Sequence, residues 1–488
     1  MIDLTINEEG RKNAVLRAKE RNIIIPTFEE MKHPEKIDEK FKKELKDIGL
    51  WDINVRNLFR ITWKNEPVAK GGDFGGPNYI ELPKELTGVD AKIVCLVGKW
   101  FPTGSHKVGA SFACLAPRLV TGQFDPVKQK AVWPSTGNYC RGGAYDSALL
   151  ACESIAILPE EMSKERFEWL EKVAGEVIAT PGCESNVKEI FDKCWELRET
   201  RGDDIMIFNQ FEEFGNHLWH HDVTGNAFEE ILKQVKTDKH NVAGAVFTTG
   251  SGGTIASGDY LKKLYPHMKI AASEALQCPT LLNNGFGGHR IEGIGDKHVP
   301  WVHNVKNTDL IIASDDEDCM RLIRLFNDPA GHDYLEKQGV KKELIEQLHL
   351  LGISGIANVL CSIKLAKYYE MTDKDIIVTV LTDSMELYCS RLGELNEKYG
   401  KYTEIDAAID YHKHLMALKI DNVLELNYYD KLRVHNLKYY TWIEQQGREL
   451  KELNRQWYDA EAYWGEIQAM GPEIDAKINE FNDMVGIK

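Results

Sequence analysis

The sequence predicts an α/β protein with two open, mostly parallel sheets, each flanked by helices. Between about residues 70 and 400, short apolar runs alternate with segments of helical period, which is typical of parallel strands joined by crossover helices. The chain has 488 residues, enough for more than one domain. Hydrophobic residues make up 43% and charged residues 28%, which is ordinary globular usage and indicates neither disorder nor a fibrous repeat.

The first group of predicted elements lies between residues 92 and 200. Short apolar runs at 92–98, 131–135, 154–159 and 176–180 predict strands. Helical segments begin after Lys107, after Asn138, near Ser163 and near Ser185, so each one follows a predicted strand. This order predicts the first parallel sheet.

A second group of elements follows. Apolar runs at 204–209, 244–250, 269–275 and 375–383 predict strands, and helices are expected near Thr224, after Gly253 and over 352–369. These elements predict a second sheet.

The two ends of the chain differ from this central region. Residues 1–69 are charged and interrupted by Pro26 and Pro34, which indicates an N-terminal arm. Residues 401–488 are long helical stretches with three tryptophans and no strand signal, so we expect a helical extension for packing or oligomerisation. The α/β catalytic region is therefore expected over 70–400, with a smaller subdomain at roughly 108–205.

Composition excludes several classes of partner. Lys and Arg number 60 against 76 Asp and Glu, a net charge of −16, so electrostatic nucleic-acid binding is not expected. The first residues are acidic where a secretory signal is basic, and no apolar run approaches a membrane span, so we expect a cytoplasmic protein. Ten scattered cysteines without a CxxC pair predict reduced thiols and neither a zinc site nor a disulfide framework.

The first candidate site residue is Lys107, in the segment PTGSHKVGA. A predicted strand runs into a Pro/Gly turn, and Lys107 stands at the start of an apolar helix. The positive end of the helix dipole disfavours an ammonium, so it favours the neutral amine that attacks a carbonyl to form a Schiff base. The alternative is a solvated surface lysine.

A second strand-to-helix turn, in FTTGSGGTIAS, carries three glycines. A dinucleotide site would need glycine where Ile255 stands, and a P-loop would need Lys-Ser/Thr after the last glycine, so NAD and ATP are not favoured. A phosphate site is favoured over a purely structural turn. Its backbone N–H groups and two hydroxyls come from Gly250, Ser251, Gly252, Gly253 and Thr254.

The third turn, STGN, closes one predicted strand and opens a helix. Its free N–H groups and short hydroxyls suit a small carboxylate, although the same residues also make a good turn and N-cap. All three turns are expected at the carboxyl ends of strands, where open α/β sheets bind ligands. A Schiff-base lysine, a phosphate site and a carboxylate site together describe pyridoxal phosphate holding an amino acid.

The ordered motifs resemble those of the fold type II pyridoxal-phosphate enzymes, most closely cysteine synthase and cystathionine β-synthase. The resemblance covers about residues 70 to 395 and includes NQFEEFGNHLWHHDVTG, HRIEGIGDKHVP and LGISGIANVL. It implies that Lys107 forms the Schiff base and moves protons at the substrate α-carbon, and that the loop from Gly250 to Thr254 binds the phosphate. It also implies that Asn138 contacts the cofactor ring oxygen. The implied substrate-binding residues are Ser135, Thr136, Gly137, Asn138 and Tyr139.

Two serines are candidates for the partner of the pyridine nitrogen. Ser354 lies in GISG, and Ser384 lies in LTDSM at the end of the last predicted strand. A neutral hydroxyl at either place leaves the pyridine unprotonated, which favours β-elimination over transamination. The sequence departs from the family pattern where Tyr139 replaces a small hydroxyl residue and where Arg141 replaces a small residue. Arg141 either pairs a second acidic group of the substrate or is an exposed structural arginine.

The implied activity is β-elimination or β-replacement on an L-amino acid with a β-leaving group, through an aminoacrylate, as in cysteine synthase or a desulfhydrase. A serine/threonine dehydratase-like ammonia-lyase and a non-catalytic, cofactor-binding subunit of a complex remain alternatives. The resemblance also implies a homodimer.

A histidine cluster supports a different reaction class. His217, His220 and His221 with Asp222 have helical metal-ligand spacing, as in a zinc hydrolase. The sequence has no HExxH motif, so a packed histidine face is favoured and no metal is predicted.

Overall fold

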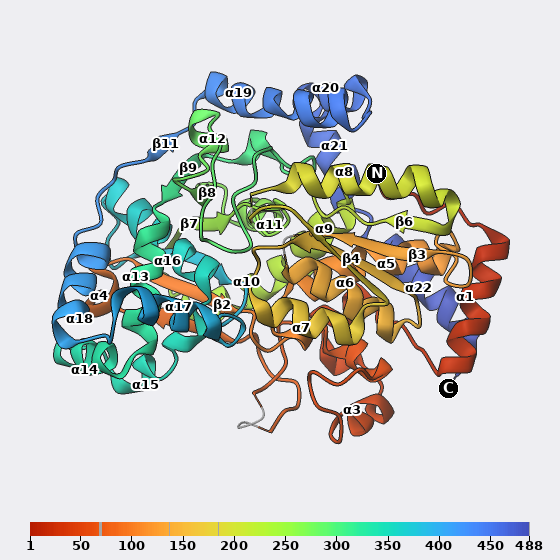
Figure 1. The fold of residues 1–488 in the computed structure, drawn as a ribbon, viewed down its shortest axis with the longest axis horizontal. Helices are drawn as coiled ribbons and strands as arrows, with labels where there is room; N and C mark the ends of the chain where they lie inside the picture. The colour runs from red at the N-terminus through yellow and green to blue at the C-terminus, as the bar shows by residue number, and fades with distance from the viewer. Residues whose placement is uncertain (68–70, 136, 184, 488) are drawn as a thin grey trace.

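The protein, described here by a computed structural model over residues 1–67, 71–135, 137–183 and 185–487, is built on two sheets (Figure 1). Within these residues, seven strands form one sheet in the order β1-β2-β10-β7-β8-β9-β11, and four form the other in the order β5-β4-β3-β6. Strands pair in parallel except β1 with β2 and β9 with β11. The predicted fold class is confirmed.

The seven-stranded sheet forms the larger half of the molecule. Strands β10 and β8 are buried along nearly their whole length, as expected for apolar parallel strands covered on both faces. Helix α16 (Ile353–Tyr368) packs on β7, β9 and β10. The strands are β1 (Tyr79–Leu82), β2 (Lys92–Val97), β7 (Asn241–Thr248), β8 (Lys269–Ala275), β9 (Leu310–Ser314), β10 (Asp375–Leu381) and β11 (Val423–Glu425). The other helices of this half are α4 (Lys84–Thr87), α9 (Phe214–Trp219), α10 (Gly225–Val235), α11 (Ala256–Leu264), α12 (Thr280–Asn283), α13 (Asp316–Asn327), α14 (Pro329–Lys337), α15 (Lys342–Ile345) and α17 (Cys389–Tyr399).

The four-stranded sheet forms the smaller half. Alternating residues of its strands face opposite layers: Val132 and Ile155 pack with helix α8, while Ala131 and Ala156 pack in the cluster that contains Tyr145 of helix α6. The strands are β3 (Lys130–Pro134), β4 (Ser154–Pro159), β5 (Glu176–Thr180) and β6 (Ile205–Ile207), and the helices are α5 (Lys107–Thr121), α6 (Asn138–Leu149), α7 (Lys164–Val173) and α8 (Val187–Arg201). Figure 1 shows α8 on one side of this sheet and α6 and α7 on the other.

The predicted grouping of strands was wrong in two places. Strand β2 belongs to the seven-stranded sheet, between β1 and β10, although it comes before the smaller half in the chain. Strand β6 belongs to the four-stranded sheet, beside β3, although it was grouped with the later strands. The chain therefore crosses between the halves after β2 and after β6. The order of the strands along the chain does not show to which sheet each strand belongs.

Three strands were not predicted. One of them, β11, contradicts the expectation that the C-terminal extension has no strand. It has three residues and pairs in the antiparallel sense with β9 at the edge of the sheet. So short a strand depends on the neighbouring strand and has no local periodicity. The other two are β1 and β9.

The arm and the extension lie against each other and against the smaller half. Helix α5 packs against both α1 and α22, and α1 packs against α22 (Figure 1). Asn7 N donates to Thr121 O at 2.8 Å, and a Cβ on Gly10 would lie 2.1 Å from Gly122 O, so α1 begins in backbone contact with the end of α5. The arm contains α1 (Glu8–Arg21), α2 (Phe28–Lys32) and α3 (Glu39–Leu45). The extension contains α18 (Glu404–Tyr411), α19 (Tyr428–Lys438), α20 (Leu450–Tyr458), α21 (Ala460–Gln468) and α22 (Gly471–Val485). Boundaries at 69 and 400 stay a prediction.

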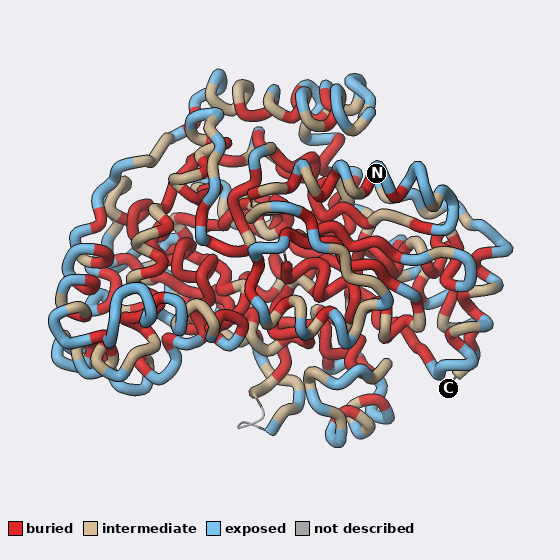
Figure 2. Tube along the Cα trace, in the orientation of Figure 1, coloured by how far each residue is buried: buried red, intermediate tan, exposed pale blue. Residues whose placement is uncertain are grey.

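Burial follows the two sheets. Figure 2 shows continuous buried segments through the strands and the helices between them, and exposed turns around the outside. In the part of the chain that the structure describes, no helix combines the length and the apolar character needed to cross a membrane.

Candidate active site

The three turns singled out in the sequence meet at one cavity between the two halves. The cavity is narrow, with a volume of about 10 Å³. It lies beyond the carboxyl ends of β2, β3, β7 and β10, as expected for open parallel sheets. Its lining consists of Lys107, Ser135, Asn138, Tyr139, Gln210, Phe211, Gly250, Ser251, Gly293, Asp296 and Thr382.

Lys107 is the first residue of α5, as predicted. The turn before it contains Thr103 and Gly104 with φ of 67° and 71°, and Ser105 Oγ accepts from Lys107 N at 3.3 Å. This turn brings Lys107 to the cavity, where its Nζ donates to Ser251 Oγ at 3.1 Å. The lysine therefore lies against the glycine-rich loop and is not a solvated surface residue.

The glycine-rich loop runs from Gly250 to Thr254, just before α11. None of its five backbone N–H groups has a hydrogen-bond partner among the residues that the structure describes. Ser251 Oγ accepts from Asn216 Nδ2 at 3.1 Å as well as from the lysine. A row of free N–H groups beside an amine is a suitable site for an anion.

The third turn, STGN at residues 135–138, is called the asparagine loop below, and its described residues form the wall from the smaller half. Ser135 Oγ accepts from Gln210 Nε2 at 3.0 Å, and Tyr139 packs edge-on against Trp133 with ring centroids 5.5 Å apart. Asn138 Nδ2 donates to Asp383 Oδ2 at 2.6 Å, and its buried Oδ1 has no partner in the described part of the chain. Thr136, also predicted to bind substrate, lies outside the described residues.

The two candidate serines lie on neighbouring segments. Ser354 is in the first turn of α16, and Ser384 follows β10; both are buried. Gly352 N donates to Asp383 O at 3.2 Å, which joins the two segments. Neither serine belongs to the lining of the cavity given above.

A group of buried charges next to the cavity was not predicted. Asp383 accepts from Tyr388 Oη at 2.6 Å, and burial raises the pKa of this carboxyl group. Arg166 Nη2 lies 3.2 Å from both Tyr388 Oη and Glu292 Oε2. A Cβ on Gly137 would lie 2.0 Å from Arg166 Nη1, so the guanidinium lies directly behind the asparagine loop.

These residues have weak sequence signals. Asp383 adjoins a candidate serine, and Asp296 directly follows the segment GIG, so an acid beside a recognised motif was the available sign. Gln210 lies within the quoted segment NQF. Arg166 has no such neighbour, because it lies behind the asparagine loop and comes from the first turn of an ordinary helix.

Arg141 was interpreted either as a partner of the substrate or as an exposed structural arginine, and the second interpretation is wrong because the residue is buried. It is 3% exposed, and its guanidinium lies over the rings of Trp51 and Trp169 at 5.4 and 4.8 Å. Burial and the nearby Arg166 lower its pKa to about 10.

The histidine cluster is dispersed among separate partners. His217 Nδ1 pairs with Val302 O at 3.1 Å, His220 Nδ1 with Thr224 Oγ1 at 2.9 Å, and His221 Nδ1 with Asp222 Oδ1 at 2.6 Å. Burial lowers the pKa of His217 to about 3, so it is neutral. No group of three metal-ligating side chains in the described residues is arranged to hold a metal ion.

The donors around the cavity fit pyridoxal phosphate. The site offers a primary amine on Lys107, a row of unpartnered N–H groups for a phosphate, and the unpartnered amide oxygen of Asn138. A Cβ on Gly253 would lie 2.1 Å from Asn216 Oδ1, so only glycine allows the loop to lie as it does. These are the groups that a phosphate ester with a reactive aldehyde requires.

Comparison with known proteins agrees with this geometry. The chain is 31% identical over 319 residues to the cysteine synthase of Staphylococcus aureus, which covers 65% of this chain and 93% of that enzyme. Its fold is similar to O-acetylserine sulfhydrylase isoform 3 of Entamoeba histolytica, with a TM-score of 0.56, 22% identity and coverage of 70% and 94% of the two chains. A hydrogen sulfide-producing enzyme of Fusobacterium nucleatum has a TM-score of 0.54, 24% identity and coverage of 71% and 95%.

Beyond the site, the similarity extends along the sequence. Residues 80–332 match the model of the family described as pyridoxal-phosphate dependent enzyme. These residues include Lys107, the asparagine loop and the glycine-rich loop. The chain therefore belongs to the pyridoxal-phosphate dependent enzymes.

Proposed function

We propose that the protein catalyses β-elimination or β-replacement on an L-amino acid that carries a leaving group on its β-carbon. The observation that carries this proposal is the contact of 3.1 Å between Lys107 Nζ and Ser251 Oγ, which puts an amine and an anion site in one cavity with the asparagine loop. Relatives named cysteine synthase and a similar fold named as a hydrogen sulfide-producing enzyme support the same reaction class.

Each loop has a proposed task. Lys107 would hold the cofactor and then move the proton at the substrate α-carbon, and the loop from Gly250 to Thr254 would bind the phosphate. Ser135, Gly137 and Asn138 would orient the substrate carboxylate. When bound, the cofactor supplies an electron sink that stabilises negative charge at the α-carbon.

The nitrogen partner of the cofactor is proposed to be Ser354 or Ser384. Both are buried hydroxyl residues on segments joined by the hydrogen bond between Gly352 and Asp383. Either hydroxyl can donate a hydrogen bond to an unprotonated ring nitrogen, which leaves the ring uncharged.

Exclusion of water from the cavity decides between β-replacement and β-elimination. The cavity wall is closed by buried side chains, and Arg166 and Glu292 pair behind the asparagine loop with side chains 0% and 3% exposed. A closed site favours addition of a second substrate, whereas water access favours release of pyruvate and ammonia. The amino acid is the proposed small-molecule partner. The homodimer and the cytoplasmic location stay predictions.

The proposal is tested by replacing Lys107 with Ala. Turnover of L-cysteine, L-serine and O-acetyl-L-serine, followed as pyruvate or sulfide released, should fall to background because no other residue supplies the amine. The visible absorption band of the bound cofactor should also shift with one of the amino acids in the wild-type protein and not in the variant.

Lys128→Ala is the matched control, because Lys128 is a surface lysine with a 56% exposed side chain. It should retain the wild-type rate and spectrum. Normal activity in Lys107→Ala would overturn the proposed function.

A further inference from the structure

Asp296 places a carboxyl group inside the cavity that Lys107 lines. The residue is 6% exposed, and its Oδ2 is buried without a hydrogen-bond partner among the described residues. A Cβ on Gly250 would lie 3.5 Å from this oxygen, so the carboxyl group lies over the start of the glycine-rich loop. An unpartnered buried oxygen that faces a ligand cavity is suited to a ligand atom.

The loop that carries Asp296 is fixed by its own contacts. Gly293 and Gly295 have φ of 97° and 78°, which only glycine adopts readily. Ile291 N donates to His289 Nδ1, so the other ring nitrogen, Nε2, carries the hydrogen and donates to Gly295 O at 2.9 Å. Thr280 Oγ1 donates to Asp296 O at 2.8 Å. The direction of the carboxyl group is therefore set by the backbone.

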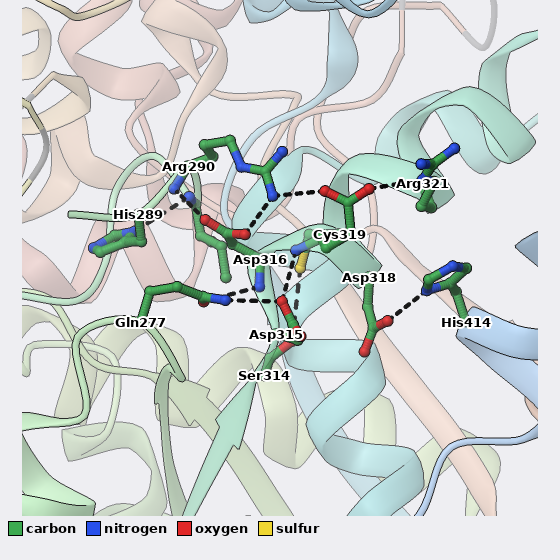
Figure 3. A network of polar contacts seen from close by, with 12 residues as sticks. Gln277, His289, Arg290, Ser314, Asp315, Asp316, Asp318, Cys319, Arg321 and His414 are labelled. Carbon is green, nitrogen blue, oxygen red and sulfur yellow. Dashed lines mark hydrogen bonds and ion pairs between the residues drawn. The ribbon is translucent and has the colours of Figure 1, made fainter. Parts of the chain in front are cut away.

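Arg290 anchors the same loop from the other side. Its backbone N donates to Asp316 Oδ2 at 3.0 Å, and its guanidinium reaches Asp316 and Glu317 on α13 (Figure 3). These contacts hold the loop to the end of β9 without using the carboxyl group of Asp296.

The surroundings of Asp296 favour a proton exchange near neutral pH. Burial raises its pKa to about 7, opposed by the charge of Lys107 across the cavity. Burial also lowers the pKa of His289 and raises that of Cys278, so both neighbours are neutral. Lys297 is the next residue in the loop.

We propose that Asp296 is a catalytic residue that gives a proton to the group leaving the β-carbon. This inference rests on the proposed function. As the bond from the β-carbon to the leaving atom breaks, that atom keeps the electron pair, takes the proton from the Asp296 carboxyl group and departs as a neutral molecule. In replacement, the carboxylate takes the proton of the incoming nucleophile while the new bond to the β-carbon forms.

The contrast with Glu274 separates this role from a structural one. Burial also raises the pKa of Glu274 to about 7. Its two oxygens, however, accept from the backbone N–H groups of Leu281 and Leu282 at 2.9 and 2.8 Å. Glu274 holds a loop, whereas Asp296 lines the cavity and its Oδ2 has no partner among the described residues.

The test uses leaving groups that differ in their need for a proton. Hydroxide from L-serine and thiolate from L-cysteine are poor leaving groups, whereas acetate from O-acetyl-L-serine leaves as a stable anion. In the holoenzyme, Asp296→Asn should lower kcat on L-serine by about 10²–10⁴-fold, the usual contribution of a general acid. On the elimination of acetate from O-acetyl-L-serine, measured without an added nucleophile, kcat should stay within about threefold of the wild type, because no proton is needed in that transition state.

The pH profile of the wild-type enzyme is a second measurement and needs no variant. Because the acid must be protonated, kcat/KM on L-serine should fall as the pH rises through about 7. This decrease of kcat/KM should be absent with O-acetyl-L-serine. Independently of turnover, the infrared band of protonated carboxyl groups should weaken in the holoenzyme over the same pH range. Asp296→Asn should lose the part of this change that Glu274→Gln retains.

Glu274→Gln is the matched control, since it removes a carboxyl group with a similar pKa outside the cavity. It should lower stability and leave the ratio of rates on the two substrates unchanged. Equal losses on L-serine and O-acetyl-L-serine in Asp296→Asn, or wild-type pH profiles that do not differ between them, would overturn the inference while the proposed function stands. A wild-type enzyme that turns over none of the amino acids overturns both.

Discussion

At the scale of single residues, the site depends on how closely the glycine-rich loop approaches Asn216. The side chain of Asn216 is fully buried, and its Nδ2 donates to Gln210 O at 2.9 Å and to Ser251 Oγ at 3.1 Å. Because both donors are used, the amide cannot turn away from Gly253 without losing the contact that positions Ser251. One side chain therefore supports the loop and the hydroxyl that contacts Lys107.

Gly253→Ala should weaken cofactor binding. The new Cβ would lie 2.1 Å from Asn216 Oδ1, and a clash of this kind costs about 1–3 kcal/mol, equivalent to about 5- to 150-fold in affinity. Titration of the protein with pyridoxal phosphate, followed by visible absorption, measures the change.

The control for this variant is Gly465→Ala in α21, where a Cβ would meet no atom within 4 Å. It should bind the cofactor like the wild type. An unchanged affinity in Gly253→Ala would show that the loop can move away from Asn216.

Among single residues, the sequence predicted the cavity lining best where a motif forms a strand-to-helix turn. Lys107, Asn138 and the loop from Gly250 to Thr254 lie at strand-to-helix turns. The sequence pattern was therefore enough to predict that they lie at the same edge of the sheets. Tertiary packing brings Asp296 to the cavity and Arg166 to the back of the asparagine loop, and a single sequence contains no periodic signal for such packing.

At the scale of elements, the first turn of α7 holds the smaller half to the larger one. Glu165 accepts from Ser390 N and Ser390 Oγ, both at 2.9 Å, and Arg391 Nη2 donates to Glu161 O at 3.2 Å. Glu292 lies between Arg166 and Arg391, with its oxygens 3.2 and 2.8 Å from their nitrogens. The two halves are thus joined by polar contacts beside the cavity.

Glu292→Gln should destabilise the protein by about 3 kcal/mol, since removing one partner of a buried ion pair leaves an uncompensated charge. The free energy of unfolding from denaturant titration is the measurement. Glu394→Gln is the control, because Glu394 pairs with the same Arg391 from a 56% exposed position. Its effect should stay within about 1 kcal/mol, and equal effects of the two variants would contradict the role given to burial.

The elements themselves were predicted better than their assignment to sheets. Each of the eight apolar runs named in the sequence corresponds to a strand. Burial on both faces gives most of them a continuous apolar run, whereas β5 and β6 are partly exposed. The positions of β2 and β6 depend on where the chain crosses between the halves, and pairing partners are not encoded in the run itself.

At the scale of the whole molecule, the extension packs on the segment that follows Asp296. Trp442 is fully buried, and its Nε1 donates to Val299 O at 2.8 Å. Lys438 Nζ donates to Trp301 O at 3.0 Å and to His303 O at 2.7 Å. Although α19 and α20 lie at the edge of the molecule in Figure 1, the extension supports the active-site loop from behind.

Trp442→Ala should lower the free energy of unfolding by about 3–5 kcal/mol, the usual cost of removing a buried large aromatic side chain. Denaturant titration is again the measurement. The neighbouring Tyr440 is 63% exposed, so Tyr440→Ala should change stability by no more than about 0.5 kcal/mol. A small effect of Trp442→Ala would mean that the extension is only loosely attached.

The position of α5 between α1 and α22 has a consequence for how the protein is made. Ribosomes release the chain from its N-terminus at about 5–20 residues per second, so the helix that begins with Lys107 emerges long before α22. Until residues 471–485 are also released, one apolar face of α5 stays uncovered. The two sheets can therefore form before α22 is available to cover α5. We expect chaperones to bind the nascent chain during this period.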